Sequence, residues 1–283
     1  MEILGNKFRE ARKRKRLSQT ALAAGICTQA TVSKIENKNR CESLDIFYSL
    51  CTKLDILVEE YLVENEEQEL TKILDDVEYL CNNNKCKEAF ELLECYGDKD
   101  VVNLSNDLAV RYLYYKGRTS SNGMSYYKQG LAYLNQAKSL SKKTSVYSLL
   151  IENAIAATYM LNGEGLKKAQ LHFERINQML QEFSEELLPP IICGLYYNLA
   201  KYFSELKEYQ KSIDLCNAGI RINKRTNSNV YLVFLLYEKA YNEFYLDGTE
   251  EGYRIAYYMS EFINHEYILG CIKKDMNKYN IEL

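Results

Sequence analysis

The shortage of helix-breaking residues in this chain narrows its fold class. Its 283 residues include 13 glycines, no tryptophan and only two prolines, which are adjacent at Pro189 and Pro190. Proline interrupts helices most strongly, so nearly the whole chain is free to be helical. Hydrophobic residues make up 47% of the sequence, which excludes disorder as a description of the whole chain. An all-α fold is therefore expected, with enough length for two domains.

Other absences exclude whole classes of site. The nine cysteines form no CxxC pair, and there are only two histidines, His172 and His265. A zinc site needs about four clustered ligands, so we predict no metal, and we expect reduced thiols and a cytoplasmic location. No signal-peptide pattern is present, and no apolar run approaches the ~20 residues that span a membrane. The sequence also lacks a phosphate-binding glycine loop, HExxH and GxSxG, so neither an enzyme nor a cofactor is predicted.

Charge is unevenly distributed along the chain. Residues 1–40 contain ten lysines and arginines against three glutamates, a net charge of +7, whereas the whole chain carries −3. The remainder is therefore acidic. This asymmetry predicts that the N-terminal segment, and not the body, meets a polyanion.

The first 56 residues contain clear helix start and stop signals. Ser18, Thr28 and Ser43 each stand where a side chain can cap a helix N-terminus, and Gly25 can take the left-handed turn between two short helices. Two short helices around a glycine turn form the unit that inserts one helix into the major groove of DNA. We therefore predict a five-helix helix-turn-helix DNA-binding domain over residues 1–56.

The motif itself resembles a known family. The stretch Leu17-Ser18-Gln19, Ala23-Ala24-Gly25-Ile26 and Val32-Ser33-Lys34-Ile35-Glu36-Asn37 is similar to the phage-repressor-like (Cro/C1, or XRE) helix-turn-helix proteins over about residues 3–56. The resemblance implies that base edges are read by Gln29, Ala30, Ser33 and Lys34, with Thr28 beside them. It implies phosphate contacts from Gln19, Arg12, Arg16, Lys38 and Arg40. The alternative for the basic run 12–16 is a solvated helix face.

The rest of the chain reads as helix pairs. A linker helix is expected over 57–65, followed by pairs at 66–82 with 85–95, 101–116 with 124–141, 145–162 with 166–183, 188–206 with 209–224, and 230–246 with 249–264, and by a capping helix near 268–279. The segment Gly117–Gly123 is expected to separate two helices. In one pair, Tyr196, Leu199, Ala200 and Phe203 precede Ser212, Cys216 and Gly219, which is similar to the tetratricopeptide (TPR) pattern. Residues 66–283 are thus predicted to form a right-handed, TPR-like α-solenoid of about five pairs that also dimerises.

Polar residues recur at one position of the predicted first helices. Asp107, Asn198 and Glu238 each stand two residues before the small residue of the pattern, and Asn153 falls at or near the same place. An asparagine carboxamide both donates and accepts, so it can pair with a peptide group as a neighbouring strand would. The alternative is a set of exposed polar residues without a ligand.

The whole chain resembles the peptide-pheromone-sensing regulators of Gram-positive bacteria (the RRNPP group), its PlcR-like branch in particular. The similarity is carried by Ile151–Ala156, followed by Asn162-Gly163, and by Tyr197–Lys201. It implies a homodimer on a near-palindromic operator, and asparagines 153 and 198 that bind the main chain of a secreted and re-imported peptide. Where relatives place lysines, this chain has Asn82 and Asn84, with Lys85 close by. The residues predicted for the peptide site are Asn153, Asn198, Lys201, Glu238, Tyr197, Tyr241 and Lys85.

The predicted function is that of a transcription regulator controlled by a short signalling peptide, as in quorum sensing. The tyrosines of the site can shape pockets for peptide side chains, or they can pack between repeats. A second prediction differs in kind: the repeats dock a protein partner, as many TPR arrays do, and control the DNA-binding domain through it.

Overall fold

The computed structural model describes residues 2–62, 66–97, 101–163 and 166–283. Within these ranges every regular element is a helix, and the only extended pairings are two isolated bridges, Glu2 with Arg40 and Ile3 with Leu62. The prediction of an all-α fold is confirmed. Contacts divide the chain into unit 1, Met1–Glu69, and unit 2, Leu70–Leu283. None of the described helices is both long and apolar enough to cross a membrane.

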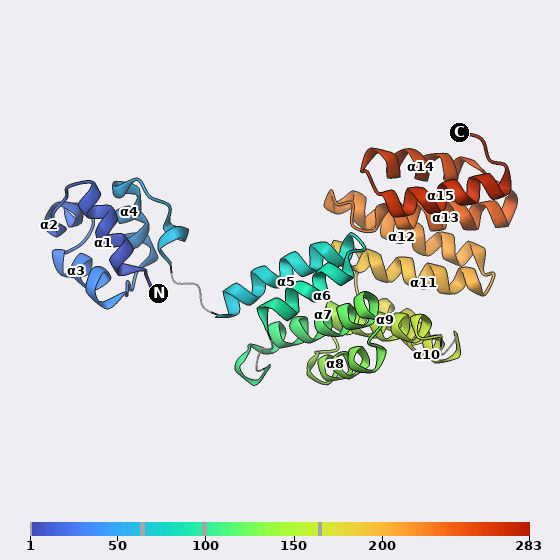
Figure 1. Ribbon diagram of the computed structural model, residues 1–283, viewed down its shortest axis with the longest axis horizontal. Coiled ribbons are helices and arrows are strands. Elements are labelled where there is room, and N and C mark those ends of the chain that lie inside the picture. The colour runs from blue at the N-terminus through green and yellow to red at the C-terminus, as the bar shows by residue number, and fades with distance from the viewer. Residues whose placement is uncertain (1, 63–65, 98–100, 164–165) are drawn as a thin grey trace. The chain divides into compact units, whose positions relative to one another are not determined.

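Unit 1 contains α1 (Gly5–Arg14), α2 (Gln19–Ala23), α3 (Gln29–Lys38), α4 (Leu44–Leu54) and a short 3₁₀ helix, η1 (Val58–Tyr61) (Figure 1). The three predicted N-caps are present: Ser18, Thr28 and Ser43 accept hydrogen bonds from the backbone N–H three residues later, at 3.0, 3.3 and 3.3 Å. Gly25 takes φ +79°, as the turn between α2 and α3 requires. Local signals therefore determine where these helices begin.

The segment after α4 differs from the prediction. Among its described residues, unit 1 has four α-helices and one 3₁₀ helix before α5 (Glu66–Asn82) begins, where five helices and a separate linker helix over 57–65 were expected. The Tyr61 side chain is buried against Phe8, with ring centroids 6.4 Å apart, and its carbonyl accepts from the Leu4 N–H at 2.8 Å. Residues 58–62 are thus held by the core of unit 1, because a buried aromatic fixes them there. Residues 63–65 of the expected linker lie outside the described residues.

Unit 2 is a succession of helix pairs. Its helices are α5 (Glu66–Asn82), α6 (Cys86–Tyr96), α7 (Asn106–Met124), α8 (Tyr127–Leu140), α9 (Val146–Leu161), α10 (Leu166–Met179), α11 (Cys193–Glu205), α12 (Tyr209–Thr226), α13 (Leu232–Asp247), α14 (Glu251–Phe262) and α15 (Glu266–Tyr279) (Figure 1). Short 3₁₀ segments, η2 (Val101–Asn103), η3 (Leu180–Glu182), η4 (Glu185–Leu187) and η5 (Pro190–Ile192), lie in connections. The helices α7, α9, α11 and α13 contact one another in order, so the first helices of the last four pairs form one continuous layer.

One predicted break is wrong. The segment Gly117–Gly123 is not a turn but part of the continuous helix α7. Glycine is used here for close approach: a Cβ on Gly117 would lie 2.6 Å from Leu134 Cγ and 2.9 Å from the Gly130 carbonyl oxygen of α8. The two glycines therefore let α7 and α8 pack backbone to backbone.

The small residues of the repeat pattern lie at helix contacts. Ser212 and Cys216 of α12 are fully buried, and a Cβ on Gly219 would lie 2.7 Å from the Leu235 side chain of α13. On α11, Leu199 and Ala200 are also fully buried. The pattern thus places α11, α12 and α13 against one another, which sets the spacing of the layer of first helices.

Candidate functional site

A polar network connects three helices of unit 1. Arg12 of α1 is 8% exposed and donates to both carboxylate oxygens of Glu36 of α3, at 2.5 and 2.9 Å. Gln19 of α2 donates to Glu36 at 2.9 Å and accepts from Gln29 of α3 at 2.6 Å. Burial opposes ionisation of Glu36, but the hydrogen bonds from Arg12 and Gln19 outweigh it and lower its pKa. The network fixes the orientation of α2 against α3.

Arg12 has a structural role in this network, which differs from the role predicted for it. A phosphate contact was expected, but the guanidinium is buried and committed to Glu36 and to the Leu17 carbonyl oxygen, at 2.6 Å. The reason is the position of Glu36, which is 2% exposed and needs a cation. Glu36 was quoted only as part of the family pattern, and no sequence signal links it to a partner 24 residues away.

The other residues predicted to face DNA lie on the surface of unit 1. Gln29 and Ala30, in the first turn of α3, are exposed, and Thr28 is exposed while it caps that helix. Lys34 forms an ion pair with Glu42, and Ser33 accepts from Asn37 at 3.2 Å. The remaining predicted cations, Arg16, Lys38 and Arg40, are exposed. Thr28, Gln29 and Ala30 thus form an exposed surface at the N-terminal turn of α3 that is suited to base edges, whereas Lys38 and Arg40 lie at the other end of that helix.

In unit 2, three cavities adjoin one another, with volumes of about 320, 650 and 560 Å³. The first shares Tyr231 and Phe234 with the second and Tyr197 and Lys201 with the third, while Tyr267 lines all three. We call these cavities together the groove. Each predicted peptide-site residue lines it: Asn153 and Asn198 the first cavity, Lys85 the second, Glu238 and Tyr241 the third, and Tyr197 and Lys201 both the first and the third.

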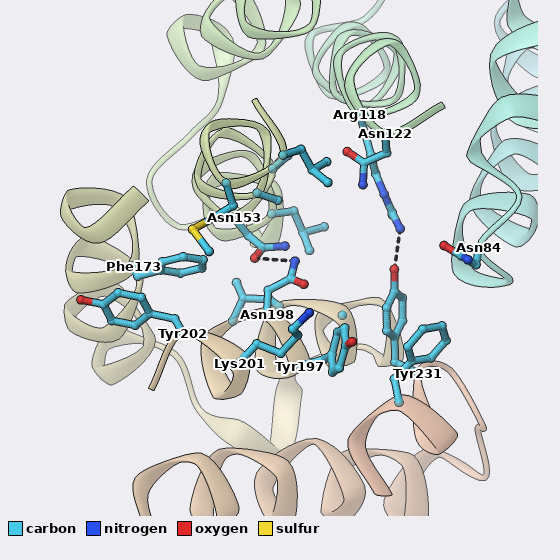
Figure 2. Close-up of a pocket in the computed structure, with 18 of the residues that line it drawn as sticks. Asn84, Arg118, Asn122, Asn153, Phe173, Tyr197, Asn198, Lys201, Tyr202 and Tyr231 are labelled. Carbon is cyan, nitrogen blue, oxygen red and sulfur yellow. Dashed lines mark hydrogen bonds between the residues drawn. The ribbon is translucent and has the colours of Figure 1, made fainter. Parts of the chain in front are cut away.

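Two asparagines meet inside the first cavity. Asn198 Nδ2 of α11 donates to Asn153 Oδ1 of α9 at 3.1 Å. Figure 2 shows the two asparagines between Phe173 and Tyr202 on one side and Arg118 on the other. Asn153 is 7% exposed. Neither carboxamide has another side-chain hydrogen bond within the described parts of the chain, so the Asn153 amide group and the Asn198 oxygen have unused capacity. Two neighbouring helices thus offer one donor group and one acceptor, as a peptide main chain requires.

The helix that carries Asn153 is tied to both of its neighbours through the adjacent residue, Glu152. Glu152 is 3% exposed and lies on α9 beside Asn153, between α8 and α10. Its carboxylate lies 2.7 Å from Lys138 Nζ, 2.6 Å from His172 Nδ1 and 3.0 Å from Arg175 Nη1. Burial alone would raise the pKa of Glu152, but these hydrogen bonds outweigh it and lower it to about 2. The ion pairs join three helices behind the asparagine.

The two ends of the first cavity differ in chemistry. At one end, Arg118 Nη2 of α7 donates to Tyr231 Oη at 2.8 Å, with Asn84 and Asn122 nearby (Figure 2). At the other end, Phe173 of α10 and Tyr202 of α11 stack with ring centroids 4.7 Å apart. Sequence reasoning missed Arg118 because a helix break was expected at that point. A continuous helix would have placed Arg118 one turn beyond Tyr114, on the same face.

The other predicted residues have more specific surroundings. Glu238 is buried, which raises its pKa, and it accepts from Asn242 Nδ2 at 3.0 Å. Lys201 Nζ lies 5.7 Å from the centre of the Tyr197 ring. Lys85 is exposed and lies 3.7 Å from Glu88. Asp107 departs from the expected polar series: it is exposed, pairs with Lys142 at 3.8 Å and lines none of the three cavities, because it stands in the first turn of α7.

Comparison with known proteins agrees with this architecture. Residues 8–61 match the helix-turn-helix family model HTH_3, and no curated protein matches the chain. The structure of Bacillus thuringiensis PlcR in complex with the peptide PapR7 and DNA aligns with a TM-score of 0.64 at 24% identity, covering 96% of this chain and 99% of that one. The chain has the PlcR fold. The prediction of a helix-turn-helix domain joined to PlcR-like helical repeats is confirmed.

Two further structures align over nearly their whole length. PlcR in its apo form gives a TM-score of 0.61 at 22% identity, covering 95% of this chain and 98% of that one. ComR from S. thermophilus, in complex with DNA and its signalling peptide ComS, gives 0.55 at 15% identity, covering 98% and 100%. The helix-turn-helix and the repeats of this chain therefore occur together, in the same order, in proteins solved with both DNA and a peptide.

Proposed function

We propose that the protein is a cytoplasmic DNA-binding transcription regulator whose DNA binding is controlled by a short signalling peptide bound in the groove. The observation that carries the proposal is the pair Asn153 and Asn198, whose unused donor and acceptor face the same cavity. PlcR and ComR, which share the fold, were each solved with DNA and a peptide. A cavity of about 320 Å³ that continues into two others suits an extended oligopeptide.

Unit 1 is proposed to read DNA with Gln29 and Ala30 at base edges, and to hold phosphates with Arg16, Lys38 and Arg40. Two copies in a homodimer would contact the half-sites of a near-palindromic operator, about one helical turn apart or more. Peptide binding would shift the population between DNA-competent and incompetent arrangements. A change from mostly off to mostly on requires several kcal/mol of differential affinity for the two arrangements.

The test uses the full-length protein and a duplex selected by it from a random DNA library. Gel shifts are measured with and without the peptide-sized fraction of spent culture medium, for the wild type, Asn153→Ala, Asn198→Ala and the control Asn135→Ala. Asn135 is exposed on α8 and lines none of the three cavities. Each lost amide contact leaves a main-chain group of the peptide unpaired, so the response of both groove variants should need roughly tenfold more fraction, or disappear.

A wild-type response in both groove variants would refute the assignment. A response that follows only the protein-sized fraction of the medium or of a cell extract would instead support the docking of a protein partner.

A further inference from the structure

Arg118 is a cation at one end of the first cavity with no carboxylate partner. Its guanidinium donates to Tyr231 Oη at 2.8 Å, to the Cys81 carbonyl oxygen at 3.2 Å and to Tyr114 Oη at 3.4 Å. A guanidinium has five N–H donors, and Arg118 also hydrogen-bonds with the Cys86 side chain, so one donor remains. Figure 2 shows the side chain reaching from α7 into the cavity beside Asn122.

Other well-buried cations of the chain are paired differently. Arg12 binds Glu36, Lys116 lies 2.7 Å from Glu94, and Arg111 lies 2.7 Å from Asp75. Throughout the described residues no carboxylate lies within ion-pair distance of Arg118. Arg118 is half-buried, so its charge is partly removed from water without a carboxylate to offset the cost, and an anion that enters the cavity would reduce that cost.

The groups around Arg118 do not neutralise it from the cavity side. Burial raises the pKa of Tyr114 to about 12 and also raises the pKa of Tyr231, so both phenols are protonated at neutral pH. A hydrogen bond with Cys81, together with the charge and a hydrogen bond of Arg118, lowers the pKa of Cys86 to about 6, so Cys86 is a neighbour of Arg118 that has an anionic form. Cys86 is buried and does not line the first cavity. The side of the guanidinium that faces the cavity therefore has no anion.

The chemistry along the cavity gives it a direction. Arg118, Asn122 and Asn84 form one polar end, Asn153 and Asn198 lie in the middle, and the stacked rings of Phe173 and Tyr202 lie at the other end (Figure 2). We infer that the groove selects a peptide carrying a carboxylate, which Arg118 binds, and an apolar side chain at the Phe173 end, with the main chain between them on the two asparagines. This inference rests on the proposed function. The carboxylate is either the peptide C-terminus or an Asp or Glu side chain.

The experiment compares two synthetic heptapeptide libraries of random sequence, one with free C-terminal carboxylates and one with C-terminal amides. Full-length protein is incubated with each library, separated by gel filtration, and the retained peptides are identified by mass spectrometry. The variants are Arg118→Gln, which removes the charge, Arg118→Lys, which keeps it, and Cys86→Ser, which removes the thiol. The control is Arg221→Gln, whose guanidinium is exposed and paired with Glu185. Thermal unfolding of each variant verifies the fold.

The wild type and Arg221→Gln should retain free acids roughly tenfold more than amides, as expected when a charge-assisted hydrogen bond is available. Arg118→Gln should lose this preference, and Arg118→Lys, which keeps the charge, should retain part of it. Should Arg118→Gln unfold, the Arg118→Lys result still tests the role of the charge. If the source is a side chain, the amide library should instead yield peptides enriched in Asp or Glu, and Arg118→Gln should lose that enrichment.

Three results would overturn the inference. The first is equal retention of acids and amides by the wild type, without enrichment of acidic residues. The second is an unchanged preference in folded Arg118→Gln. The third is a preference for free acids that is absent from the wild type and present in Cys86→Ser, which would show that the Cys86 thiolate is the counter-ion of Arg118. In all three the proposed function stands if Asn153→Ala lowers retention of both libraries, whereas retention of no peptide by the wild type removes both proposals.

Discussion

The carboxylate of Glu152 should stabilise unit 2 in a pH-dependent way. Its pKa falls from an ordinary 4.5 to about 2, which corresponds to about 3 kcal/mol of stability at neutral pH. Lys138 and Arg175 are partly exposed, with 37% and 46% of their side chains accessible, so solvent screens part of this interaction. We therefore expect about 2 kcal/mol.

The sign follows from the direction of the pKa change. Because the folded-state pKa lies below the unfolded value, the stabilisation is complete above about pH 4.5 and is lost as the pH falls toward 2. Glu152→Gln removes the charge at nearly constant shape. Urea unfolding of the full-length protein should show the variant less stable by about 2 kcal/mol at pH 7. The difference should fall below half of that by pH 3 and nearly vanish near pH 2.

The matched control is Glu261→Gln, because Glu261 is exposed on α14 and forms no ion pair within the described residues. Hydrogen exchange of α8, α9 and α10 locates the effect. A stability difference that stays constant from pH 7 to pH 3 would refute the reasoning, since the loss would then come from packing and not from charge.

Two further predictions concern helix packing and DNA binding. Gly130→Ala should destabilise unit 2 by about 1–3 kcal/mol in thermal or urea unfolding, because the new Cβ would meet Ser121 Oγ, whereas Gly270→Ala, with nothing within 4 Å of its Cβ, should not. An equal effect of both substitutions would contradict the close approach of α7 and α8. Lys34→Ala should weaken DNA binding and lower the slope of log affinity against log salt by about one, since a cation now paired with Glu42 would leave the interface. A slope equal to that of the wild type would show that Lys34 contacts no phosphate.

The features that could be predicted from the sequence are those whose interacting residues lie close together in the chain. The N-caps Ser18, Thr28 and Ser43 act within three residues, and the helices that follow them begin where expected. The pattern on α11 and α12 likewise acts between adjacent helices. Such features can be read from one segment at a time.

Long-range partners could not be predicted in the same way. Nothing in the basic run around Arg12 distinguishes the one arginine that Glu36 buries from its exposed neighbours. The glycines of α7 were predicted to interrupt the helix. Glycine permits both a turn and a close packing contact between helices, and the sequence alone does not distinguish the two. That misreading removed Arg118 from the predicted site. By contrast, Asn153 and Asn198 were predicted from the family resemblance together with a recurring polar position of the repeat, although their mutual hydrogen bond spans 45 residues.

The hydrogen bond between Arg118 and Tyr231 affects how unit 2 unfolds. In most repeat proteins each unit touches only its neighbours, so the array can fray from its ends. Here one hydrogen bond joins α7 to the residue that precedes α13, 113 positions away in the chain. The start of α13 cannot separate from α7 without breaking that bond. Melting of the array up to α13 should therefore be more cooperative than nearest-neighbour stacking alone would give.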